Sequence, residues 1–358
     1  LFIFMFSNVI APHLVIIPSF LIVLLMLKKR GVLGSKSIYF IHICWAIFII
    51  IFLMNFFSYH NNEYYAEILL FLFLISSMYI GIFCGLYFKD SLLNVIVIWV
   101  LVILIQLTTN NTLDQLLNQR WTVTNGWINS NAIGACLVFS IPFLIKCVNN
   151  SKLRIIKLIA FLEILTIIMV LFLLSSRGSL LSLSIIALFL FIMKREKIKL
   201  IGFILPILMV LIFMFFKIDI LKESLALTVE RVTSSGLNGR EGLWSEAMEV
   251  IRNNPLYGIG ARNGDRTDFH NPLLHITVHY GLLAVIPMAV LLISPIIQYI
   301  RNKAYKNKTS TLFMSVYIAI VAQSSLEAIL TPLIMGSIGW YFIGFVYGYI
   351  IRNRVIRI

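Results

Sequence analysis

Long, uninterrupted apolar runs are the feature that most constrains how this chain can fold. A run of about 18 or more apolar residues is long enough to cross the hydrocarbon core of a bilayer as a helix. Hydrophobic residues make up 60% of the 358 residues and charged residues only 12%, whereas about one quarter of a soluble domain is charged. We therefore predict an all-α polytopic membrane protein.

The apolar runs predict eleven transmembrane helices. They cover residues 8–27, 38–57, 66–88, 92–109, 129–148, 158–174, 179–193, 200–216, 272–300, 311–330 and 333–351. The run 272–300 is long enough to be tilted, broken or partly re-entrant. A further helix preceding the written N-terminus would bring the total to twelve. The sequence contains no segment that resembles a removable signal peptide.

The basic residues orient these helices. Most of the 29 Lys and Arg residues lie in every second loop, and therefore on one side of the membrane. Short loops rich in Lys and Arg stay in the cytoplasm. These residues are Lys28, Lys29, Arg30, Lys36, Lys89, Lys146, Lys152, Arg154, Lys157, Lys194, Arg195, Lys197, Lys199, Arg301, Lys303, Lys306, Lys308, Arg352, Arg354 and Arg357. We expect transmembrane helices 1–8 in residues 1–216, an extracytoplasmic loop domain in 217–271, and helices 9–11 with a cytoplasmic tail in 272–358.

The net charge of +14 follows from this topology. Basic loops at the membrane attract anionic lipid headgroups, so membrane lipids, rather than nucleic acid, are the expected partners. The cysteines lie within or at the ends of spans, which argues against a disulfide framework or a thiolate zinc site. The short cytoplasmic loops carry no Gly-rich phosphate loop or nucleotide signature, so we expect any chemistry to take place on the outer face.

The large loop contains a predicted amphipathic helix. From residue 238 onward, Asn238 and Glu241 are spaced as in a capping box, and Asn253-Asn254-Pro255 ends the helical pattern. One apolar stripe runs through Leu243, Trp244, Ala247, Met248 and Ile251 at three- and four-residue spacing. Such a helix would lie on the membrane surface or on the outer helix ends, as a floor or lid over a site.

Two arginines and two glutamates are candidates for function. Arg177 lies between two apolar runs with almost no loop between them. It is either a helix-end anchor or a functional group. Arg240 opens the loop helix, where the dipole disfavours a cation, so it is either an ordinary exposed residue or serves a group outside the helix. Glu163 and Glu327 lie within predicted spans. Each could pair with an arginine, act as a hydrogen-bond hub or contact substrate; Glu327 shares the outer leaflet with Arg177.

His270 stands at the junction between the loop and the membrane, close to Arg262 and Arg266. Nearby positive charge favours the neutral imidazole, which can accept a proton as a general base. His275 and His279 share one helix face and could bind a metal. Because no third-ligand pattern accompanies them, we expect polar contacts within the bundle instead, and we predict no metal site.

Several of these segments resemble motifs of one family. The segments are "NGWINSNAIG" at 125–134, "SSRGSLLSL" at 175–183, "GREGLWSEAMEVIRNNPLYGIGARN" at 239–263 and "HNPLLHITVHYGLLA" at 270–284. They resemble, in order, the Gly-x-x-x-x-Asn, Ser-Arg-Gly, Gly-Arg to Asn-Pro-Leu-x-Gly-x-Gly, and His-Asn elements of the O-antigen ligase and oligosaccharide repeat-unit polymerase family of bacterial membrane glycosyltransferases. The resemblance extends over about 120–285.

The resemblance implies a donor glycan on an undecaprenyl pyrophosphate carrier. An acceptor hydroxyl displaces the pyrophosphate at the anomeric carbon with inversion, and no metal or other cofactor is needed. Resemblance and charge together assign Arg177 and Arg240 to the pyrophosphate, because guanidinium groups bind phosphate oxygens bidentately. His270 would act as the base on the acceptor hydroxyl or would orient it. Further expected substrate contacts are Arg262, Arg266, Arg120, Glu327 and Asn271.

The shared motifs fit two products. A polymerase joins lipid-linked repeat units, whereas a ligase transfers the finished glycan to a lipid or protein. Abundant Ile, Asn, Lys and Phe are typical of an AT-rich genome and favour a bacterium without an outer membrane. We therefore expect a polymerase in the cytoplasmic membrane, facing outward, with a flippase and a chain-length regulator as partners. A transporter of lipid-linked sugars is the alternative from another class, but the inverted repeats it predicts are not visible.

Overall fold

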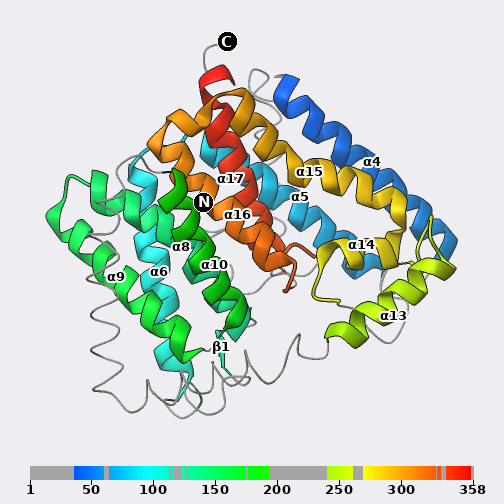
Figure 1. Cartoon of the computed structure of the whole chain (residues 1–358), viewed down its shortest axis with the longest axis horizontal. Coiled ribbons are helices and arrows are strands. Elements are labelled where there is room, and N and C mark those ends of the chain that lie inside the picture. Colours follow the sequence, from blue (N-terminus) through cyan, green and yellow to red (C-terminus); the bar gives the residue numbers. More distant parts are fainter. Residues whose placement is uncertain are drawn as a thin grey trace.

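The computed structural model describes residues 36–59, 64–112, 115, 123–125, 128–174, 176–193, 240–260, 269–327, 329–331 and 336–355. These residues are almost entirely helical (Figure 1). The helices are α4 (Lys36–Tyr59), α5 (Tyr64–Leu86), α6 (Ser91–Asn110), α8 (Ser130–Asn150), α9 (Arg154–Leu173), α10 (Arg177–Met193), α13 (Arg240–Asn253), α14 (Pro272–Tyr280), α15 (Leu282–Arg301), the 3-10 helix η2 (Ala304–Lys306), α16 (Lys308–Ser324) and α17 (Gly336–Val355). A short hairpin of β1 (Thr124–Asn125) and β2 (Ile128–Asn129) pairs antiparallel just before α8.

Five helical segments in the described ranges are long and apolar enough to cross a membrane. They are Ile38–Asn55, Ser91–Asn110, Ser130–Asn150, Arg154–Leu173 and Leu282–Arg301. Leu70–Leu86 and Gly178–Met193 are shorter apolar helices. The predicted helical membrane class is therefore supported. The predicted spans 8–27 and 200–216 lie outside the described residues, so the total of eleven and the extent of the large loop stay predictions.

The long run 272–300 is broken rather than continuous. α14 ends at Tyr280 and α15 begins at Leu282. Gly281 between them has φ 78°, and a Cβ added there would lie 2.0 Å from the carbonyl oxygen of Leu256. That φ and that close approach both require glycine. The backbone N–H of Leu282 donates to the carbonyl of Pro255. This hydrogen bond joins the turn after α13 to the start of α15.

Helices α5 and α17 pack along a seam of small residues. A Cβ added at Gly85 would lie 2.1 Å from the carbonyl oxygen of Phe345, and one added at Gly344 would lie 2.1 Å from that of Met78. Gly348 is equally close to Ile82. Small residues let helix backbones approach in this way inside a membrane. Because Met78 pairs with Gly344 and Ile82 with Gly348, the two helices run parallel, in agreement with the predicted topology.

The two ends of the bundle differ in composition. At one end, α8, α15 and α17 finish and α9 and α16 start (Figure 1). We call it the basic end, because Lys146, Lys306 and Arg352 lie in or between these helix ends. Lys146 donates to the hydroxyl of Thr309 there at 3.0 Å, and the Asn302 amide donates to the carbonyl of Ile350 at 3.4 Å. The opposite end carries β1, the start of α10 and the amphipathic helix α13. The polar network described next lies at that opposite end.

Candidate active site

The carboxylate of Glu327, just beyond the end of α16, joins three other parts of the chain. Its Oε1 accepts a hydrogen bond from Arg240 Nη2 at 2.8 Å, and its Oε2 accepts one from Asn131 Nδ2 at 3.2 Å. Oε2 also lies 3.9 Å from His270 Nδ1, close enough for an ion pair when the imidazole is protonated. The side chains of Arg240 and Glu327 are only 14% and 11% exposed. Solvent therefore screens their attraction weakly.

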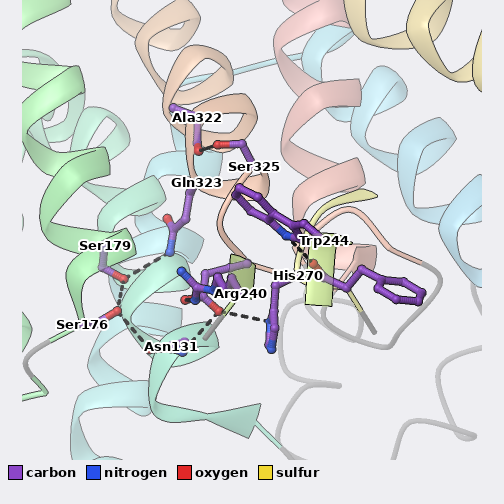
Figure 2. A network of polar contacts seen from close by, with 11 residues as sticks. Asn131, Ser176, Ser179, Arg240, Trp244, His270, Ala322, Gln323 and Ser325 are labelled. Carbon is purple, nitrogen blue, oxygen red and sulfur yellow. Dashed lines mark hydrogen bonds and ion pairs between the residues drawn. The ribbon is translucent and has the colours of Figure 1, made fainter. Parts of the chain in front are cut away.

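The first turn of α10 is fixed beside this carboxylate by small polar residues (Figure 2). Ser176 Oγ donates to Asn131 Oδ1 at 3.3 Å and lies 2.9 Å from Ser179 Oγ. The Gln323 amide of α16 donates to Ser179 Oγ at 3.3 Å. Gly178 makes room for α16, because a Cβ there would lie 3.4 Å from Gln323 Cγ. The residues on either side of Arg177 thus lock the start of α10 against α8 and α16.

The same network continues one turn deeper into the bundle. Ser182 Oγ donates to Gln323 Oε1 at 2.8 Å, and both residues are fully buried. Gly134 of α8 allows the approach of α10, because a Cβ there would lie 2.4 Å from Ser179 Oγ. Buried polar groups are stable only when they are hydrogen-bonded, so these contacts restrict how α8, α10 and α16 can pack.

His270 has a left-handed backbone conformation, with φ 51°. Residues other than glycine adopt it at a cost and tend to do so at functional sites. The residues on both sides hold it there. The carbonyl of the buried Phe269 accepts a hydrogen bond from Trp244 Nε1 at 3.1 Å. Asn271 caps α14, because its Oδ1 accepts hydrogen bonds from the backbone N–H groups of Leu273 and Leu274.

Helix α13 contacts both the Glu327 carboxylate and the segment that carries His270. Arg240 and Trp244 are one helical turn apart, so they share a face. The first reaches Glu327 and the second reaches the residue before His270. The amphipathic helix predicted in this loop is confirmed over Arg240–Asn253, and Arg240 does serve a group outside its own helix. Asn238, the predicted cap, lies outside the described residues.

Four of the predicted site residues lie together here: Arg240, His270, Asn271 and Glu327. Arg177 begins α10 beside them, but its side chain lies outside the described part of the chain. Arg120, Arg262 and Arg266 also lie outside the described residues, so their predicted substrate contacts stay predictions.

The two histidines on α14 make local contacts. His279 Nδ1 lies 2.9 Å from the carbonyl oxygen of Gly260, and the His275 and His279 rings are 4.6 Å apart. Among the described residues, no group of three or more His, Cys, Asp or Glu is arranged to hold a metal ion. These contacts agree with the bundle role that the sequence predicts for both residues.

The sequence pattern does not single out six residues of the network: Asn131, Ser176, Ser179, Ser182, Gln323 and Trp244. Signals for most of them were present. Asn131 lies in "NGWINSNAIG", and the three serines lie in "SSRGSLLSL". Trp244 was assigned to the apolar stripe of α13, but its indole N–H also has a hydrogen-bond role. For Gln323 the only signal is a polar residue within an apolar run.

The arrangement supplies complementary groups for a displacement reaction. Arg240 uses one N–H of Nη2 on Glu327, and a guanidinium has five in all. The remaining donors suit an anion such as a phosphate. His270 turns Nδ1 toward the carboxylate, which leaves Nε2 on the other edge of the ring. An imidazole oriented in this way can take a proton from a hydroxyl.

The family comparison covers this site in part. Residues 162–289 match the family described as O-antigen ligase, and a search of curated proteins finds no match. The matched segment includes Arg177, Arg240 and His270 but neither Asn131 nor Glu327. At a coarse level it indicates a glycosyl-transfer enzyme of the membrane that acts on lipid-linked glycans. The chain therefore carries an O-antigen ligase family segment at residues 162–289, which confirms the relationship that its motifs indicate.

Proposed function

We propose that this protein polymerises lipid-linked oligosaccharide repeat units into a surface polysaccharide such as a capsule, exopolysaccharide or O-antigen. It acts on the outer face of a bacterial cytoplasmic membrane and uses an undecaprenyl pyrophosphate-linked donor. The observation that carries the proposal is that Arg240 and His270 both lie against the carboxylate of Glu327, at the end of the bundle opposite the basic end. Arg240 and His270 belong to the family segment, and Glu327 lies outside it.

Arg240 binds the pyrophosphate of the donor. Its side chain is largely buried, and one hydrogen bond to Glu327 fixes its direction. Negative charge grows on the pyrophosphate as it leaves, and donors already in place stabilise that charge more strongly in a dehydrated site than in water. Arg177, at the start of α10, is the proposed second cation. Arg262, Arg266 and Arg120 are proposed further contacts.

His270 accepts the proton of the attacking hydroxyl. Its side chain is 39% exposed, so an acceptor sugar can reach it. As the proton moves to the imidazole, the hydroxyl oxygen bonds to the anomeric carbon, and the bond from that carbon to the pyrophosphate oxygen breaks. The undecaprenyl pyrophosphate leaves with the bonding electrons, and the configuration at the anomeric carbon inverts. The proton is later released to solvent.

The test is the length profile of surface and lipid-linked glycan in cells that carry His270→Ala or Arg177→Lys. Membrane expression is checked, and Ser325→Ala is the control. The Ser325 hydroxyl is exposed and donates only to the Ala322 carbonyl among the contacts observed. We expect the ladder of chain lengths to collapse to single repeats in both variants and to persist in the control. An unchanged ladder in both variants would refute these two assignments and favour transport.

A ligase is the second candidate, because the matching family is described as O-antigen ligase. The donor is the same and only the acceptor differs, so Arg240 and His270 would have the same roles. In that case the variants would accumulate full-length lipid-linked chains that do not reach their final lipid or protein acceptor. The same length profile therefore separates the two products.

A further inference from the structure

Glu327 is the group through which the two proposed catalytic side chains are connected. Arg240 contacts one carboxylate oxygen, and the other oxygen faces both Asn131 and His270. Arg240 belongs to α13 and Asn131 to α8, and His270 precedes α14. Elements remote in the sequence thus converge on one acidic side chain.

The chain also fixes the orientation of this carboxylate. The backbone N–H of Glu327 donates to the Gln323 carbonyl at 2.9 Å, and its own carbonyl accepts from the Ile329 N–H at 2.8 Å. Its Cγ lies against the first turn of α10 at Gly178. The Gln323 side chain, fully buried, is held in turn by Ser179 and Ser182. Such supporting contacts are what keep a functional constellation rigid.

We propose that Glu327 is a positioning residue that aligns Arg240 and His270 with each other and does not itself bind substrate. The inference rests on the proposed glycosyl transfer and revises the direct substrate contact that the sequence predicts for Glu327. Two facts carry it. The carboxylate is largely buried and engaged by Arg240 and Asn131, and the proposed leaving group is an anion, which a carboxylate would repel.

The two oxygens have different effects. On Arg240, Oε1 holds one edge of the guanidinium and leaves its other N–H groups directed to the pyrophosphate. On His270, Oε2 attracts an N–H on Nδ1, which selects the tautomer with an unprotonated Nε2 and stabilises the imidazolium that forms when Nε2 takes the acceptor proton. Glu327 thereby sets the distance between Arg240, which assists departure of the pyrophosphate, and His270, which assists attack by the acceptor hydroxyl.

The experiment uses the full chain, purified and reconstituted in liposomes, with an undecaprenyl pyrophosphate-linked oligosaccharide as the donor. Initial rates at varied donor concentration give KM and kcat for the wild type, Glu327→Gln, Glu327→Asp and the Ser325→Ala control. Glu327→Gln keeps the shape but removes the charge, and Glu327→Asp keeps the charge on a shorter chain. Thermal unfolding of each purified variant shows whether it is folded.

We expect Glu327→Gln to raise the donor KM about tenfold, as loss of a charge-assisted contact would. We expect kcat to fall by roughly a hundredfold, the cost of a base displaced by about 1 Å. Glu327→Asp recovers part of both losses, and Ser325→Ala matches the wild type. If Glu327 acts through Arg240, Glu327→Gln raises the donor KM much less in an Arg240→Ala background, because coupled residues are not additive.

Three results would overturn the inference. They are wild-type kinetics for folded Glu327→Gln, no recovery in Glu327→Asp, or fully additive effects of Glu327→Gln and Arg240→Ala on the donor KM. The last result would indicate a separate contact between Glu327 and substrate. Absence of glycan transfer by the wild-type protein would instead contradict the proposed function itself, so the two failures are distinguishable.

Discussion

The left-handed backbone of His270 makes Trp244→Phe an informative substitution. The left-handed conformation costs about 1–2 kcal/mol in a residue other than glycine. Two anchors oppose that cost: the hydrogen bond from Trp244 Nε1 to the Phe269 carbonyl, at 3.1 Å, and the cap that Asn271 forms on α14. Each is worth about 1 kcal/mol, so strain and anchors nearly balance at His270.

Removing one anchor shifts this balance by about 1 kcal/mol toward a relaxed backbone. Near balance, a shift of that size lowers the population of the held imidazole about threefold, from roughly one half to roughly one sixth. We therefore expect Trp244→Phe to lower kcat for glycan transfer by about that factor. The donor KM should change little, because the contact between Arg240 and Glu327 does not involve the indole.

The assay is the initial rate at saturating lipid-linked donor, with the purified protein in liposomes. Trp45→Phe is the matched control. It removes an indole N–H that donates to Met78 Sδ at 3.3 Å in the core. We expect Trp45→Phe to retain kcat. Equal kcat for folded Trp244→Phe and the wild type, or a loss confined to the donor KM, would refute the reasoning.

Further substitutions test the network and the packing. Asn131→Asp sets a second carboxylate about 3 Å from Glu327, and the two negative charges repel, so we expect a larger loss of transfer rate than in Asn131→Ala. A larger loss in Asn131→Ala would contradict the hydrogen bond between Asn131 and Glu327. Gly85→Ala directs a Cβ to 2.1 Å from the Phe345 carbonyl and should lower the unfolding temperature in detergent, since overpacking costs about 1–3 kcal/mol. Gly242→Ala is its control: a Cβ there meets nothing within 4 Å, and we expect a gain of about 0.5–1 kcal/mol. Gly281→Ala, at φ 78°, should reduce the yield of monodisperse protein on size exclusion; a normal yield would show that the break tolerates a side chain.

Much of the helical architecture could be predicted from the sequence, because a membrane-spanning helix needs only a long enough apolar run. The described helices α4, α6, α8, α9 and α15 overlap predicted spans. The break at Gly281 was one of several alternatives for 272–300, because the run is apolar on both sides. What decides it is the contact with the turn at Leu256, which a hydropathy pattern does not contain.

The candidate site could be predicted only in part. Arg240, His270 and Glu327 stand out because ionisable groups near apolar segments are costly. Which of them pair depends on how α13, α8 and α16 pack, and the sequence pattern does not specify that. Asn131 and Gln323 are uncharged, so their importance appears only when the structure shows them bonded to Glu327 and Ser179. The left-handed His270 likewise has no composition signal, because the hydrogen bond that holds the preceding residue comes from Trp244 in helix α13.

The proposed function requires that this chain transfers glycan between lipid-linked units, with His270 at the reacting hydroxyl. The most direct measurement resolves by length the products that the purified protein forms in liposomes from an undecaprenyl pyrophosphate-linked repeat unit. We expect a ladder of longer lipid-linked chains with the wild type and single repeats with folded His270→Ala. A wild-type protein that leaves the repeat unit unextended, or a His270→Ala protein that makes the same ladder, would contradict the account.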